Sequence, residues 1–323
     1  MAQLTRKRVI LIEAESSYGT DPTPAATDVV LVRDLSITPQ SSDVVSRDVV
    51  RPFLGAFQQL LANTKVEVTF SVELAGSGAA GTAPRYGSAL KACGFSETVA
   101  SGTSVTYEPI SASFSSVTIH YNTDGVRHIV TGCRGSFTIN ASVGEIPSID
   151  FTFTGIYNAP TDTALPATTY GNQATPLIFK NGNTTGFQLL SHSAALQSIS
   201  MDIGNEIVYR ELVGGTKETL ITNRNISGTV QIEAMALGTK DYFAAAVAET
   251  TGNLTFLHGT TAGNKVQVTS TKADIGDVAY SEMDGIQMLD IPYTLVPSTA
   301  NDEVSIVYLS LIHISEPTRL ATI

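Results

Sequence analysis

The residues with the clearest chemical pattern form a glycine-rich run, Gly76–Gly81, whose letters GSGAAG fit the G-x-G-x-x-G pattern of dinucleotide-binding loops. Glu97 lies about where a ribose-binding carboxylate would stand. A dinucleotide fold, however, begins its helix at the glycines of a parallel unit. Here residues 82–84 (TAP) intervene, and the strands that follow have an antiparallel pattern. The run therefore favours a mobile loop of small residues, and we predict no cofactor.

The other reactive residue types are scattered. His120 and His128 flank an expected hairpin turn, but no third ligand follows at metal spacing. The motifs HExxH, GxSxG and the P-loop are absent, and the acidic residues occur singly. Cys93 and Cys133 belong to no CxxC pair, which favours two buried thiols, with a disulfide or a metal site as alternatives. We predict no catalytic residue, no metal ligand and no enzymatic activity.

The charge balance limits the choice of partners. The 323 residues carry a formal net charge of −11 with only 19 Lys and Arg, which argues against tight binding of nucleic acid. An acidic wall would still let nucleic acid pass without sticking. Charged residues make up only 15% of the chain, which suits surfaces that meet other subunits.

The start of the chain lacks the pattern of a secretory signal. Only four apolar residues follow the basic cluster at residues 6–8 before Glu13, and no apolar stretch reaches the length of a membrane span. We therefore expect no membrane partner, and we expect the protein to stay in the cytosol until assembly or lysis.

Period-two alternation dominates the chain and predicts antiparallel strands with one buried face. In Lys65–Leu74 every second residue is apolar, and the residues between are charged or hydroxylic. Short helices are expected at Tyr86–Cys93 and at Asp241–Thr250, where Asp241 is a suitable N-cap, and a third is conceivable at Phe53–Ala62. Six further alternating runs are Ser116–Tyr121, Gly135–Asn140, Ser148–Tyr157, Gly228–Met235, Lys265–Thr269 and Gln287–Val296.

The two halves of the chain have the same order of elements. Each has a strand, a short helix, a set of strands and a closing strand followed by proline, which predicts a duplicated domain. The segment Asn158–Pro176 between them has three prolines and the composition of a linker. We place the boundary near Ala167, with a first module at residues 1–165 and a second at 166–308.

The last residues differ from everything before them. Leu309–Arg319 resembles the in-frame translation of a transposase sequencing adapter. We therefore expect residues 309–323 to be a sequencing artefact.

Four segments of the first half carry a family resemblance through their joint order: Ile12–Pro22, Leu35–Pro39, Arg85–Phe95 and Phe151–Tyr157. Roughly from Arg6 to Pro160, the chain resembles the tail tube proteins of siphophages, particularly those of Mu-like transposable phages of Pseudomonas. The resemblance implies a mainly β protein with two tandem β-barrel or β-sandwich modules, each with one short flanking helix.

This resemblance also implies partners. Copies of the chain would form stacked rings around a lumen that conducts DNA without binding it, in a virion tail. Two modules per chain would give a trimeric ring with pseudo-six-fold symmetry, and a hexamer is the alternative. Tape measure and tail terminator proteins are the other expected partners. The expected ring-to-ring contacts are the N-terminal arm with Tyr18 and the glycine-rich loop with Gly76, Ser77, Gly78 and Gly81.

Two other classes of protein remain open. One is a different virion β-protein, such as a head-decoration or baseplate-hub subunit. The other is a surface adhesin or carbohydrate-binding module, against which the absence of tryptophan counts.

Overall fold

The computed structural model describes residues 3–47 and 49–309. These residues form strands β1 to β20 and two short α-helices, so the predicted mainly β fold with one short helix in each half is confirmed. None of the described helices is long and apolar enough to cross a membrane.

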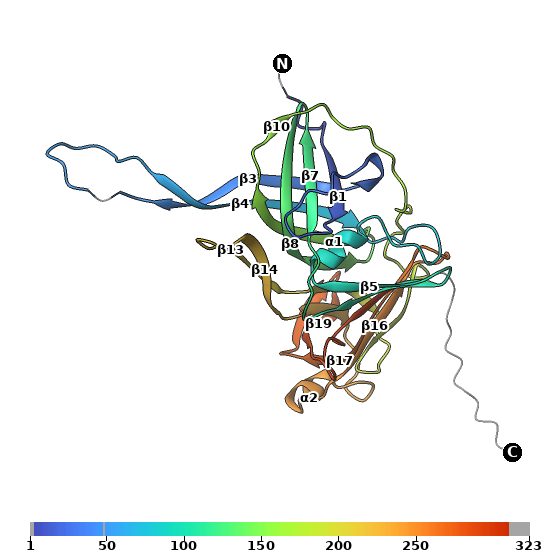
Figure 1. Cartoon of the computed structure of the whole chain (residues 1–323). Coiled ribbons are helices and arrows are strands. Elements are labelled where there is room, and N and C mark those ends of the chain that lie inside the picture. The colour runs from blue at the N-terminus through green and yellow to red at the C-terminus, as the bar shows by residue number, and fades with distance from the viewer. Residues whose placement is uncertain (1–2, 48, 310–323) are drawn as a thin grey trace.

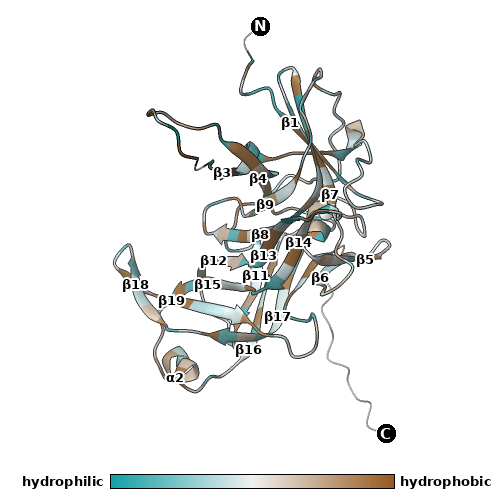
Figure 2. Cartoon of the chain, turned by 60° about the vertical axis from the view of Figure 1, so that its left-hand side comes forward, coloured by the Kyte–Doolittle hydropathy of each residue, from teal (hydrophilic) through white to brown (hydrophobic). Residues whose placement is uncertain are grey.

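The central feature is a row of eight antiparallel strands, which Figure 2 shows stacked from the upper to the lower part of the molecule. In spatial order they are β3 (Arg33–Val45), β4 (Leu60–Glu73), β9 (Ser148–Tyr157), β8 (Val126–Ser142), β12 (Leu196–Asp202), β15 (Ser227–Glu233), β19 (Ile286–Leu295) and β18 (Ala279–Met283). We call this row the eight-stranded sheet.

The order of strands is the same in the two halves of this sheet. β3, β4, β9 and β8 come from the first half of the chain, and β12, β15, β19 and β18 follow in the same sense from the second. The pairing of β8 with β12 joins the two sets. Within the chain the sheet stays open and does not close into a barrel.

One face of the sheet is apolar because alternate side chains of each strand point to the same side. Val68 and Phe70 of β4 are buried there, and Phe151 and Phe153 of β9 lie opposite them. The rings of Phe70 and Phe151 are 5.3 Å apart between centroids. Burying each such side chain contributes about 1.5–3 kcal/mol, so this face forms the core.

A second set of strands covers the core. It runs β5, β6, β20, β17, β16, β11 and thus also joins the two halves. A smaller group, β2, β1 and β7, extends from the first part of β8, and the short β10 also pairs with β8. The bounds are β5 (Phe95–Ala100), β6 (Ser104–Pro109), β20 (Ser305–Leu309), β17 (Lys265–Ile275), β16 (Gly252–His258), β11 (Thr184–Leu189), β2 (Val29–Val30), β1 (Val9–Ala14), β7 (Val117–Thr123) and β10 (Thr161–Asp162).

The helices are short. α1 (Gly87–Ala92) is buried on the side of Ala89 and Leu90. α2 (Tyr242–Val247) begins after Asp241, whose Oδ1 accepts a hydrogen bond from the Ala244 amide at 2.8 Å, so the predicted N-cap is confirmed. A 3-10 turn, η1, spans Ala26–Asp28.

The third helix suggested for Phe53–Ala62 is wrong. These residues lie in the β3–β4 hairpin, where β4 already begins at Leu60. Figure 1 shows this hairpin projecting to the left, away from the body of the molecule. In the second half, the hairpin of β13 (Asn205–Glu211) and β14 (Lys217–Arg224) takes the same place in the chain, between β12 and β15.

The expected linker runs along the first half of the chain. The Thr169 amide donates to the Ala26 carbonyl at 2.9 Å, and the Ala174 amide donates to the Gly76 carbonyl at 2.9 Å. The module boundaries drawn from the sequence stay a prediction. Leu309 ends β20, and the rest of the adapter-like segment, residues 310–323, lies outside the described residues.

Candidate functional site

The second face of the eight-stranded sheet is polar. Along each strand, the residues that alternate with the core residues point to this face, and residues opposite each other on neighbouring strands share a face. Three basic residues, Arg33, Lys65 and Arg134, lie on it. The acidic residues on this polar face are Glu67, Glu73, Asp150, Asp202, Glu233 and Asp290. The face is therefore negatively charged across both halves of the chain.

Asp150 organises the polar face of the first half. Its carboxylate accepts hydrogen bonds from Ser71 Oγ of β4 and from Asn140 Nδ2 of β8, the latter at 2.7 Å. One carboxylate thus binds both neighbouring strands and holds their register.

Asp290 has the equivalent position in the second half. It accepts a hydrogen bond from Gln231 Nε2 of β15 at 2.9 Å, and the same nitrogen lies 3.2 Å from Ser281 Oγ of β18. β15 and β18 flank β19 in the second half, as β4 and β8 flank β9 in the first. The two halves therefore place the same kind of polar network on the same face.

Both ends of the eight-stranded sheet are open edges. Among the described residues, β3 pairs only with β4, and β18 pairs only with β19. The Leu35 carbonyl of β3 accepts a hydrogen bond from Arg8 Nη1 at 2.6 Å, so it points away from β4. Unpaired strand edges are templates for pairing with another chain.

The projecting part of the β3–β4 hairpin, residues 41–47 and 49–61, is called the arm. The Arg51 guanidinium lies over the rings of Phe53 and Phe57, at 4.6 and 4.2 Å from their centroids. Apolar side chains exposed on the arm are Val44, Val45, Val49, Val50, Phe53, Leu54, Leu60 and Leu61. A soluble monomer rarely exposes so many apolar side chains together, which makes the arm a candidate contact surface.

Tyr18, one of the predicted contact residues, joins the two halves within one chain. Its hydroxyl donates to the Gly132 carbonyl at 3.1 Å and accepts from the Thr219 amide of β14 at 2.5 Å. The Arg134 guanidinium lies 4.9 Å from the ring centroid and donates to the Thr219 carbonyl at 2.8 Å. The β13–β14 hairpin is therefore held against the first half.

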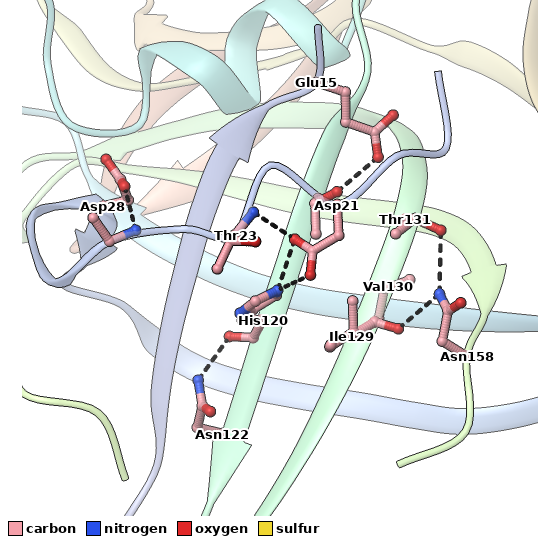
Figure 3. Close-up of polar contacts among 12 residues, drawn as sticks. Glu15, Asp21, Thr23, Asp28, His120, Asn122, Ile129, Val130, Thr131 and Asn158 are labelled. Carbon is pink, nitrogen blue, oxygen red and sulfur yellow. Dashed lines mark hydrogen bonds and ion pairs between the residues drawn. The ribbon is translucent and has the colours of Figure 1, made fainter. Parts of the chain in front are cut away.

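The N-terminal loop that carries Tyr18 is fixed by carboxylates (Figure 3). Glu15 accepts hydrogen bonds from Thr118 Oγ1 and from the Gly132 amide, both at 2.7 Å. Asp21 lies 3.0 Å from His120 Nε2, and burial lowers the pKa of this histidine. These groups position the loop, and no cluster suited to a metal ion occurs among the described residues.

The glycine-rich loop packs against the second half rather than lying free in solvent. The Gly76 amide donates to Asn264 Oδ1 at 2.9 Å, and the Gly78 amide donates to the Gly263 carbonyl at 3.0 Å. Ser77 is buried. A Cβ at Gly81 would lie 2.3 Å from the Gly102 nitrogen. The role of these residues between rings stays a prediction.

Replacing Gly76 with alanine is expected to destabilise the folded chain. A Cβ at this position would lie 2.0 Å from the Gly263 carbonyl oxygen. Overpacking of this kind costs about 1–3 kcal/mol, so thermal unfolding should shift down by several degrees. Gly238→Ala is the matched control, since its Cβ would meet nothing within 4 Å. Equal unfolding temperatures for the two variants would contradict the contact.

Two further features of the described residues are the cysteines and a hollow beside β11. Cys93 and Cys133 are free and buried, as the first interpretation from sequence expects, and burial raises the pKa of both thiols. A hollow of about 590 Å³ in the second half is lined by apolar and hydroxylic residues, with Lys180 as its one ionisable lining residue.

A comparison with known protein families identifies the family of the chain. A family model described as phage tail tube protein matches residues 5–295. The chain belongs to the phage tail tube protein family. No curated protein matches it. The family resemblance seen in the sequence is confirmed, whereas the Mu-like type stays a prediction.

The tail tube subunit is a structural component of the virion tail and self-assembles into a tube. The match covers the polar face, both open edges and the arm. These features are therefore the candidate functional surfaces of the protein. Sequence reasoning did not single out the polar face or the arm; the alternation in Lys65–Leu74 was the available signal for the former.

Proposed function

We propose that three copies of this tail tube subunit form a ring, and that the rings stack into a tube whose lumen is lined by the polar face. The repeated strand order carries this proposal. One chain supplies the same set of four strands twice, so three chains supply six similar sets, and a closed ring leaves no edge of the eight-stranded sheet exposed. A ring of six chains is the alternative.

The duplication itself is part of the proposal. We take residues 1–165 and 166–308 as two tail-tube modules, each with one hairpin, one short helix and four strands of the eight-stranded sheet. The networks around Asp150 and Asp290 support this division, because each binds the neighbouring strands on the same face.

The acidic face suits the passage of genomic DNA. DNA binding requires cationic groups that neutralise phosphates, whereas a surface dominated by carboxylates repels them. DNA would therefore slide through the lumen without specific binding. Assembly in the host cytoplasm would involve a tape measure protein and a tail terminator protein as partners.

Contacts between stacked rings would involve the N-terminal loop and the glycine-rich loop. Gly78 and Ala79 are the exposed part of the latter, since Gly76 and Ser77 are buried. Tyr18 would act through the position of its loop, because its hydroxyl is occupied within the chain.

The test of this function is electron microscopy of the purified full chain together with native mass spectrometry. Annuli or tubes with three copies per ring are expected. Compact particles without a lumen would contradict the tube and would favour a head-decoration or baseplate-hub role. A ring of six copies would contradict the trimer.

The orientation of the polar face can be tested with a cysteine. Thr229→Cys places a thiol on the exposed polar face, and Glu108→Cys places one on the exposed part of β6. In free subunits both should react with a bulky polymer maleimide. In tubes Thr229→Cys should react at least about ten-fold more slowly, while Glu108→Cys stays reactive. Equal rates for Thr229→Cys in subunits and tubes would place the polar face outside.

A further inference from the structure

We propose that β18 of one copy pairs antiparallel with β3 of the next copy, in the register that β8 and β12 adopt within the chain, so that Ser281 lies opposite Ser36. This inference rests on the proposed ring and names the two edges that close it. The partner of each edge is a second copy of this chain.

The template is the pairing between the two halves. β8 and β12 are antiparallel, with Asn140 opposite Ser200, Ile139 opposite Met201 and Ala141 opposite Ile199. β8 is the last strand of the first set of four, and β12 is the first strand of the second set. In a ring of like sets, the last strand of the second set, β18, meets the first strand of the first set, β3.

The residues of β18 are matched to those of β8 through the two aspartates. Asn140 stands two residues beyond the β8 residue opposite Asp150, and it binds that carboxylate. Ser281 stands two residues beyond the β18 residue opposite Asp290, and it binds Gln231 of the same network. Ser281 is therefore the counterpart of Asn140.

The counterpart of Ser200 on β3 follows from the next strands. Ser200 of β12 lies opposite Thr229 of β15, and Thr229 lies opposite Pro292 of β19. Pro292 is two residues beyond Asp290.

The first half has the same path across three strands. Ser36 of β3 lies opposite Thr69 of β4, and Thr69 lies opposite Thr152 of β9. Thr152 is two residues beyond Asp150, so Ser36 is the counterpart of Ser200. Transfer of the pairing of Ser200 with Asn140 then puts Ser36 opposite Ser281, and Ile37 opposite Tyr280.

The hydrogen-bonding phase of the template is fixed by its two ends. The Val143 amide donates to the Gln197 carbonyl at 2.9 Å, and the Ile203 amide donates to the Phe137 carbonyl at 3.0 Å. In an antiparallel pair hydrogen-bonded and non-hydrogen-bonded positions alternate. The Ser200 position is therefore a non-hydrogen-bonded pair, and its two neighbours are hydrogen-bonded pairs.

The backbone groups of β18 and β3 that point away from their own partner strands match this phase. β18 and β19 are joined by the two-residue turn Asp284–Gly285, with φ of 52° and 80°, so the pair that closes the turn is hydrogen-bonded. By alternation the backbone groups of Tyr280 and Glu282 point away from β19. On β3, the Leu35 carbonyl points away from β4. Leu35 is the residue that the register places opposite Glu282.

The side chains also fit the template. Ile139 and Met201 are buried on the core side of the β8–β12 pair. Their counterparts are Tyr280, which is 58% exposed in the single chain, and the partly buried Ile37. Pairing of the edges would bring these two apolar side chains together and cover the exposed tyrosine ring.

A disulfide test follows from the register. Ser36→Cys and Ser281→Cys in one chain should cross-link neighbouring copies of assembled rings on oxidation, and non-reducing electrophoresis should show linked species that end at the trimer. Mixing the two single variants should give linked dimers only. Directly opposite residues have Cα atoms about 4.5–5.5 Å apart, within the range of a disulfide.

The matched control is Ser36→Cys with Ala279→Cys, which shifts one thiol by two residues along the same face. Diagonal Cα atoms lie about 7–8 Å apart, so the control should cross-link at least about ten-fold less. Cys93 and Cys133 are buried and should not contribute.

Two results would overturn the register but leave the proposed ring intact. One is that rings of the Ser36→Cys/Ser281→Cys variant form without a cross-link, and the other is that the control variant cross-links better. A link within a single chain would also overturn it. Electron microscopy of the wild-type chain separates these outcomes from failure of the proposed function, in which no annuli or tubes form at all.

Discussion

Replacing Phe53 and Leu54 with serine is expected to leave the free subunit folded and to prevent its polymerisation. Both side chains lie on the arm, with exposed fractions of 64% and 101%. Because neither contributes to the core, the free energy of unfolding should change by less than about 0.5 kcal/mol. A contact with a neighbouring copy would bury both.

The size of the effect follows from the area that assembly would bury. Each large apolar side chain contributes about 1.5–3 kcal/mol when it is buried, so the double variant loses about 3–6 kcal/mol per contact. At about 1.4 kcal/mol per ten-fold change, the concentration required for assembly should rise at least about a hundred-fold. Sedimentation velocity over a concentration series measures this rise.

The second hairpin supports this role of the arm. The β13–β14 hairpin occupies the corresponding place in the second half and docks on the first half. Asn205 Nδ2 donates to the Gly135 carbonyl at 2.9 Å and to the Cys93 carbonyl at 2.7 Å. In a ring of like modules, the arm would dock on the second half of the next copy in the same way.

Leu237→Ser with Val247→Ser is the matched control for the arm. These side chains are also exposed, at 58% and 88%, but they lie in the second half around α2. The control should assemble at nearly the wild-type concentration. An arm variant that assembles as readily as this control would show that the arm makes no contact between copies.

The second large effect is expected from Glu282→Pro, which should stop ring closure. In the proposed register the Glu282 amide faces the neighbouring β3, and proline lacks that donor. Its pyrrolidine ring would also occupy the space between the strands. The β18–β19 pairing should survive, since a proline is tolerated where the N–H points away from the partner strand.

Glu282→Ala keeps the backbone donor and should assemble like the wild type. Native mass spectrometry of the proline variant should show monomers and open oligomers instead of closed trimers. Closed rings of the proline variant would contradict the assignment of this edge.

The strands of the core were predictable because their pattern is local. Lys65–Leu74 alternates strictly, and the structure buries Val66, Val68 and Phe70 of this run on one face. The N-cap at Asp241 was predictable for the same reason, since a cap depends on residues only three positions apart.

The features that failed or were missed depend on distant residues. The glycine-rich loop suggested mobility, yet Gly76 bonds Asn264, 188 residues away. The apolar-rich run at residues 53–62 suggested a short helix, whereas these residues lie on the exposed arm. Apolar periodicity signals burial without saying whether the covering surface belongs to the same chain or to another copy.

The candidate contact residues illustrate the same limit. Tyr18 and the glycine-rich loop were chosen as contacts between rings, and the structure places both in contacts between the halves of one chain. No pattern within either segment could separate these two uses, because an internal junction and a junction between copies require the same chemistry.

The most direct test of the central claim is a cryo-electron microscopy reconstruction of tubes assembled from the full chain. We predict three copies per ring, the polar face with Asp150 and Asp290 toward the lumen, and Ser36 of each copy opposite Ser281 of its neighbour. A ring of six copies, or a lumen lined by another face of the subunit, would contradict the account.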